Sequence, residues 1–191
     1  MQYKSHVLYH LEVNTGGFYH ALDSVLDTLE RLQTSFLNNI GLTREEGFLA
    51  YNLAPLSTRR DIAMLGLIYK SVHKTAHNDL QSLFPRSAGP RHSYQTKYQA
   101  HRHDMQLVED RPGTKHALLR RSVFGLTRIW NRLPGAVVHA KTVTECQKAL
   151  TAMVRAGCRK GLRDWSELLS PRPIILRESP YFECLHTLSL E

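Results

Sequence analysis

Hydrophobic residues between Pro55 and Lys74 recur at the spacing of an α-helix. The segment reads PLSTRRDIAMLGLIYKSVHK, and one helical face carries the apolar residues Ile62, Leu65, Tyr69 and Val72. Further apolar surface on the other sides comes from Met64, Leu67 and Ile68. A helix that is apolar around most of its circumference is buried against several neighbours. We therefore expect a central helix here, with Gly66 at a close helix crossing.

Shorter patterns predict further helices in the first half of the chain. Thr43 and Glu46 form a capping-box pattern for a short helix that runs to about Asn52. Residues 78–84 fit one more helical turn or two, whereas residues 3–18 fit a short strand as well as a pair of helical turns. Apolar residues spaced by threes and fours predict a helix over 21–41, whose core-facing stripe is Leu22, Val25, Leu26, Leu29, Leu32, Phe36 and Ile40.

Two amphipathic segments follow, and each has cations opposite its apolar face. The first spans 122–133, with the apolar positions Val123, Leu126, Trp130 and Leu133. The second begins with a capping-box pattern at Thr142 and Glu145, and its apolar positions are Val143, Cys146, Leu150 and Met153. Helical spacing places cations on the outer faces, at Arg121, Arg128 and Arg132 in the first segment and at Lys141, Lys148, Arg155 and Arg159 in the second.

Together these patterns predict a mainly α fold, an irregular bundle of about five to seven helices with a long loop near 86–116. We expect a helical part over 1–84, a linker or loop over 85–116, a basic helical part over 117–170 and a loose tail over 171–191. Residues 86–116 are rich in His, Arg, Gln, Gly and Pro and show no helical or alternating period, which is typical of a loop.

Charge is concentrated in one part of the chain. The net charge of the 191 residues is +8, yet residues 111–163 contain twelve Lys or Arg and one acid, Glu145, so this segment carries +11 and the remainder −3. Such a segment suggests a polyanionic partner, with nucleic acid the first candidate, although a solvated basic face without a partner stays an alternative. The candidate contacts are Lys115, Arg120, Arg121, Arg128, Arg132, Lys141, Lys148, Arg155, Arg159 and Lys160.

No motif for catalysis, metal binding or membrane insertion emerges from the sequence. A Gly-rich phosphate loop, HExxH, Gly-x-Ser-x-Gly and Cys-x-x-Cys are all missing, and we expect no metal site and no cofactor. The His101-x-His103 pair supplies fewer ligands than a metal site needs. No apolar run reaches the roughly 18 residues of a membrane span. Three cysteines without a paired spacing indicate reduced thiols inside a cell, in the nucleus or the cytoplasm.

Several stretches come in an order that resembles a known family. They are LERLQTSFL (29–37), LAPLSTRRDIAMLGLIYKSVH (53–73), DLQSLF (79–84) and RRSVFGLTRIWNRLPGAVVHAKTVTECQKAL (120–150). This order resembles the region after the polymerase palm in reverse transcriptases of LINE-type, non-LTR retrotransposons. The resemblance covers about residues 5–155. Its motif positions are Glu30 with Gln33, Arg59 with Arg60, Tyr69 with Lys70, and Trp130 through Pro134.

That resemblance implies a thumb-like part that grips template RNA and primer DNA. The paired palm aspartates of the family are missing from the chain, so we expect no polymerase activity from it alone. The implied partners are RNA or an RNA/DNA hybrid and the palm and fingers of a parent polymerase. A truncated or degenerate element copy is the expected origin. The alternatives are a non-functional retroelement remnant and a helical protein-interaction module.

Overall fold

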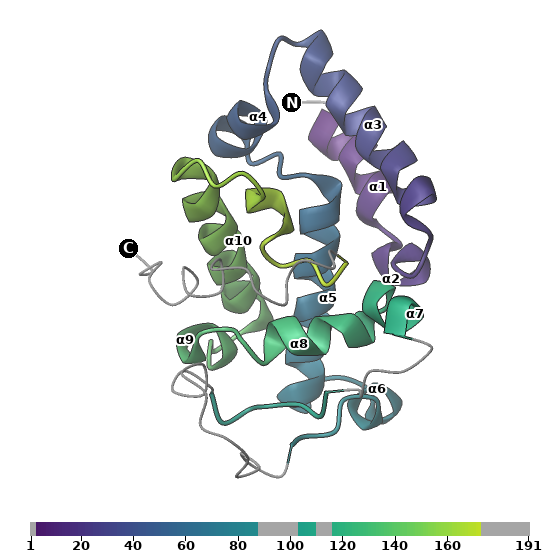
Figure 1. Cartoon of the computed structure of the whole chain (residues 1–191), viewed down its shortest axis with the longest axis vertical. Coiled ribbons are helices and arrows are strands. Elements are labelled where there is room, and N and C mark those ends of the chain that lie inside the picture. The colour runs from purple at the N-terminus through teal and green to yellow at the C-terminus, as the bar shows by residue number, and fades with distance from the viewer. Residues whose placement is uncertain (1–2, 88–102, 110–115, 173–191) are drawn as a thin grey trace.

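The computed structural model describes residues 3–87, 103–109 and 116–172 (Figure 1). Within these ranges it is helical and contains no strand, and a single antiparallel bridge joins Arg86 to Leu107. A π-helical turn at Tyr3–Leu8 comes first, and 3₁₀ turns lie at Val123–Gly125 and Trp165–Glu167. The α-helices are α1 Tyr9–Glu12, α2 Thr15–Phe18, α3 Asp23–Asn39, α4 Arg44–Tyr51, α5 Leu56–Val72, α6 Asn78–Ser82, α7 His116–Arg121, α8 Leu126–Trp130, α9 Gly135–Val138 and α10 Val143–Arg159.

The mainly α class is confirmed, but the expected number of five to seven helices is too low for the described ranges. Ten α-helices occur there, and six of them have only four to six residues. Such short helices carry too few apolar positions to show a period in the sequence. The ambiguous residues 3–18 are helical, and the predicted helix over 122–133 is divided into a 3₁₀ turn and α8.

The predicted central helix is α5, against which α3, α8 and α10 pack. Figure 1 shows α10 running beside α5 and α8 crossing its lower half. The approach of α10 to α5 is close at Gly66, as expected, because a Cβ there would lie 3.3 Å from Cγ2 of Val143 and closer still to the side-chain amide of Gln147. Added side-chain volume at this position therefore pushes directly on α10.

One hydrophobic core joins the two halves of the chain. Its members run from Tyr19 through Phe48, Leu65 and Trp130 to Leu169, so both the 1–84 part and the 117–170 part contribute. A smaller cluster of Leu8, Leu37, Leu53 and Leu56 lies under the N-terminal helices. Within the described residues, no helix is long and apolar enough to cross a membrane.

The stripe predicted for α3 is wrong at four of its seven positions, and the other three are buried or partly buried. Leu22, Val25 and Leu32 are each 54% exposed, whereas Gln33 and Leu37 are buried. Ile40, which follows the helix, is exposed as well. The helix therefore packs along an edge that includes Leu26 and Leu37, about one residue position away from the stripe that apolar spacing alone selects.

Part of the predicted loop is packed against the helices rather than solvated. His103 and Leu107 are buried, and Nε1 of Trp130 donates to the carbonyl of Met105 at 2.9 Å. His103 is bonded through both ring nitrogens, to the carbonyl of Trp130 and to the N–H of Met105. Burial lowers the pKa of His103. The segment 103–109 is thus held by side-chain contacts that have no periodic signature in the sequence.

Candidate functional site

The strongest candidate surface lies on α10. Thr142 caps this helix by accepting from the N–H of Glu145 at 3.1 Å. The Glu145 carboxylate accepts from the N–H of Lys141 at 3.0 Å, so the only acid between residues 111 and 163 is bound at the start of the helix. This arrangement differs from the predicted capping box, because the carboxylate reaches the residue before Thr142. Beyond Lys148, which lies three residues after Glu145, the cations of α10 have no acidic neighbour on their own helix.

The two faces of α10 have different chemistry. Cys146, Leu150 and Met153 are buried in the core, as the apolar spacing predicts. Lys148 and Arg159 lie on the opposite face, and both are exposed. The residues exposed in and around this helix that carry positive charge are Lys141, Lys148, Arg159, Lys160 and Arg163. The outer face of α10 therefore carries exposed cations in its first half and at its end.

Arg155 belongs to the predicted set but is engaged within the fold. Its Nη1 donates to the carbonyl of Leu49 at 2.9 Å, and its Nη2 donates to Oδ1 of Asn52 at 2.8 Å. The guanidinium also lies over the ring of Phe48, 5.0 Å from its centroid. Arg155 thus ties the end of α4 to α10 while keeping its charge at the edge of the outer surface.

The remaining predicted cations lie elsewhere or outside the described residues. Lys115 falls in 110–115, which the structure does not describe. Arg120 and Arg121 end α7 and are half-buried, and each has a buried Nε without a hydrogen-bond partner among the described residues. Arg128 on α8 is half-buried, and Arg132 is exposed. The two pockets along α10 are lined by no residue of α7 or α8, so these arginines do not contribute to them.

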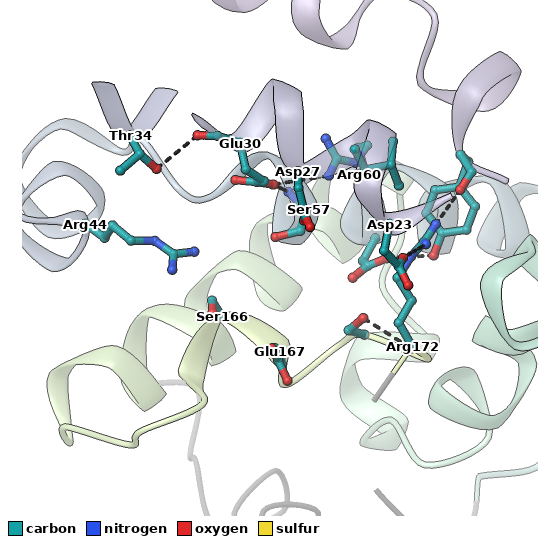
Figure 2. Close-up of a pocket in the computed structure, with 14 residues that line it drawn as sticks. Asp23, Asp27, Glu30, Thr34, Arg44, Ser57, Arg60, Ser166, Glu167 and Arg172 are labelled. Carbon is teal, nitrogen blue, oxygen red and sulfur yellow. Dashed lines mark hydrogen bonds and ion pairs between the residues drawn. The ribbon is translucent and has the colours of Figure 1, made fainter. Parts of the chain in front are cut away.

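A second candidate is a polar pocket of about 520 Å³ between α3, the start of α5 and residues 166–172 (Figure 2). Glu30 on α3 lies above the first turn of α5 and accepts from the N–H groups of Leu56 and Ser57. The same carboxylate pairs with Arg60 at 3.1 Å. Pro55 precedes the helix and provides no side-chain cap. Glu30, on another helix, instead supplies the negative charge that stabilises a helix start.

The deeper side of this pocket contains Asp61 and Tyr19. The Tyr19 hydroxyl donates to Oδ1 of Asp61 at 2.6 Å, and both residues are buried. Burial raises the pKa of Asp61 to about 7. Arg172 donates to the carbonyl of Tyr19 at 2.5 Å and forms an ion pair with Asp23, at the right of Figure 2.

These contacts connect α2, α3, α5 and the end of the described chain. Arg60 and Arg172 are therefore each paired with a carboxylate within the fold, which indicates a structural role. Among the described residues, no three His, Cys, Asp or Glu side chains are placed to hold a metal ion.

The motif residues of the first half also have structural partners. Nε2 of Gln33 donates to the carbonyl of Ala54 at 2.9 Å and more weakly to that of Leu53. Arg59 forms an ion pair with Glu12, which attaches α1 to α5. These contacts fix the connection between α4 and α5 and the position of the N-terminal helices.

Motif residues of the second half of the chain also have structural partners. The Tyr69 hydroxyl donates to the carbonyl of Ala140 at 2.6 Å, and Trp130 and Asn131 hold the segment 103–109. The positions that carry the family resemblance therefore build the fold, and the exposed cations lie mostly at other positions.

Sequence reasoning missed the polar residues that line a groove beside the α10 cations. They are Asn52, Gln147 and Thr151. Neutral side chains of this kind occur on any solvated helix, so only the close crossing at Gly66 hinted that α5 and α10 form a common surface. No protein-family model, curated protein or solved structure matches the chain.

Proposed function

We propose that this chain binds nucleic acid through the exposed cations of α10, which contact phosphate groups. The observation that supports the proposal most strongly is the exposure of Lys148, Arg159 and Lys160 without acidic partners. All three are exposed, and within the described residues none of them lies within 4.0 Å of a carboxylate. Exposed helix faces without a polyanionic partner usually intersperse acids with bases. A face with cations alone is suited to phosphates.

Acidic residues elsewhere in the chain support the same interpretation. The Lys and Arg ion pairs described for the chain involve Arg59, Arg60 and Arg172, all outside 111–163. Their acidic partners lie on α1 and α3 or at its start. The described carboxylates that pair with Lys or Arg therefore lie away from α10, and the exposed cations of this helix remain available to a ligand.

The kind of nucleic acid is proposed from the resemblance to LINE-type reverse transcriptases. In that family, the region after the palm helps to grip template RNA and primer DNA. We accordingly propose RNA or an RNA/DNA hybrid as the ligand of this chain, as part of a larger polymerase. The palm aspartates that transfer nucleotides in the family are not in this sequence, so the proposed role is binding without catalysis.

A matched pair of double variants tests this proposal. Lys148→Gln with Arg159→Gln removes two charges from α10, and Lys4→Gln with Arg31→Gln removes two exposed charges from the N-terminal helices. Fluorescence anisotropy with labelled RNA and with an RNA/DNA hybrid gives the affinities at one salt concentration. We expect the α10 variant to bind about tenfold more weakly, because two phosphate contacts are lost, and the control to change much less. Equal losses in both variants would contradict the proposal.

A helical protein-interaction module is the second candidate, and one observation favours it. The exposed apolar side chains of Leu22, Val25 and Leu32 lie on one face of α3. Large apolar residues gathered on one face mark contact surfaces more often than solvated ones. Replacing Val25 and Leu32 with Glu should prevent association with a parent polymerase domain, measured by co-elution, while leaving affinity for nucleic acid unchanged.

A further inference from the structure

A groove in two adjoining parts lies along α5 and α10. One part has a volume of about 640 Å³ and reaches from the turn between α1 and α2 to α10, and a second part of about 360 Å³ follows the outer face of α10. The two parts adjoin, because Asn52, Gln147 and Thr151 line both. We call the two parts together the α5–α10 groove. Its volume lies in the range of sites that hold small organic groups.

The walls of the α5–α10 groove combine apolar surface with uncommitted amides. Val13, Ala63 and Leu67 line it and are exposed or partly exposed, so they offer an apolar contact. The side-chain amide of Gln147 has no hydrogen-bond partner among the described residues. Oδ1 of Asn52 accepts from Arg155, and its Nδ2 has no partner in the part of the chain that the structure describes. Hydrogen-bond donors and acceptors thus lie beside an apolar surface that a planar ring can contact.

The charge of the groove is positive. Lys148 and Arg155 line its outer part, and Arg59 lines the inner part. The only acid along it is Glu12, which is already paired with Arg59. The polar pocket of Figure 2 differs, because five carboxylates and three arginines line it and a phosphate would be repelled there. Charge complementarity therefore assigns a phosphate-bearing ligand to the α5–α10 groove.

From these features we infer that the α5–α10 groove receives an unpaired base of a single-stranded nucleic acid. The inference rests on the nucleic-acid binding proposed above and adds which form of the ligand is preferred. A base reaches the apolar wall only when it is free of its partner strand, because duplex bases face one another. Its edge then meets the amides of Asn52 and Gln147, and Lys148 contacts the adjoining phosphate. Every base has a flat face, so an apolar contact of this kind does not require one particular base.

The test compares one strand with its duplex. Anisotropy is measured for a labelled 12-nucleotide RNA and for the blunt RNA duplex of the same sequence, both at the same salt concentration. Ala63→Phe fills the groove from α5 without changing charge, and Ala50→Phe places the same ring on the exposed face of α4 as a control. Gln147→Ala serves as a second groove variant, since it removes an amide without adding volume. Circular dichroism verifies that each variant is folded.

We expect the single strand to bind about tenfold more tightly than the duplex. Ala63→Phe and Gln147→Ala should reduce this preference, and Ala50→Phe should not. Equal binding of strand and duplex, unaffected by either groove variant, overturns the groove inference and leaves the proposed phosphate contacts intact. Absence of binding to either RNA overturns the proposed function itself, and the groove inference fails with it.

Discussion

Asn131 pairs with the backbone of Leu107 as a neighbouring strand would. Its Oδ1 accepts from the N–H of Leu107 at 2.8 Å, and its Nδ2 donates to the carbonyl of the same residue at 2.9 Å. Leu107 is buried, so its two polar backbone groups have little access to water. One amide side chain therefore allows an extended segment to enter an otherwise helical core, because buried backbone groups must be hydrogen-bonded.

Asn131→Ala should destabilise the protein by about 2–4 kcal/mol, because it leaves both backbone groups of Leu107 buried without partners. Urea denaturation followed by circular dichroism measures the free energy of unfolding. Asn38→Ala on the exposed side of α3 is the control and should change it by less than about 0.5 kcal/mol. A loss at Asn131 no larger than the loss at Asn38 would show that Leu107 is not held in this way.

Asp61→Asn should alter how stability depends on pH. Burial raises the pKa of Asp61 from 3.8 to about 7, so the folded protein retains a proton that the unfolded chain has released between these values. The contribution of Asp61 to the free energy of unfolding is fully present below about pH 4 and is lost as the pH rises to about 7.

An asparagine retains the acceptor for the Tyr19 hydroxyl and has no charge to bury. The variant should therefore gain stability relative to the wild type as the pH is raised from 4 to 7, with a constant difference above pH 7. Urea denaturation of both proteins at several pH values measures that difference. Parallel stability curves over the whole range would contradict the assignment.

Gly125→Ala should be costly although alanine favours helices. A Cβ at this position would lie 2.9 Å from both the Cα and the carbonyl carbon of Arg120, and backbone atoms cannot move aside as a flexible side chain can. We expect a loss of about 1–3 kcal/mol, typical of overpacking. Gly16→Ala is the matched control, since no atom lies within 4 Å of its added methyl group. Thermal melting should separate the two variants clearly.

Sequence patterns predicted the long helices well and the details of α3 poorly. α5 and α10 have strong apolar faces, so their positions follow from periodicity. In α3, Gln33 is buried because its amide binds the carbonyls of Leu53 and Ala54, and Glu30 turns toward the start of α5. These polar contacts rotate the helix away from its most apolar stripe and expose Leu32. Such contacts between distant segments cannot be found from spacing along one helix.

The sequence predicted only part of the candidate surface, and the reason is similar. Charge along the chain identifies Lys148 and Arg159, since cations without acidic neighbours are visible in the sequence. The engagement of Arg155 by Asn52 was not predictable, because it joins residues 103 positions apart. The α5–α10 groove depends in the same way on how α1, α5 and α10 meet.

The dependence of binding on salt tests the central claim most directly. If α10 contacts phosphates, log Kd for RNA must change linearly with log salt concentration, because bound cations release counterions from the nucleic acid. Lys148→Gln with Arg159→Gln should reduce the magnitude of that slope by about 1.4–1.8, at about 0.7–0.9 per phosphate contact. The Lys4→Gln and Arg31→Gln control should keep the wild-type slope. An unchanged slope in the α10 variant would contradict the account.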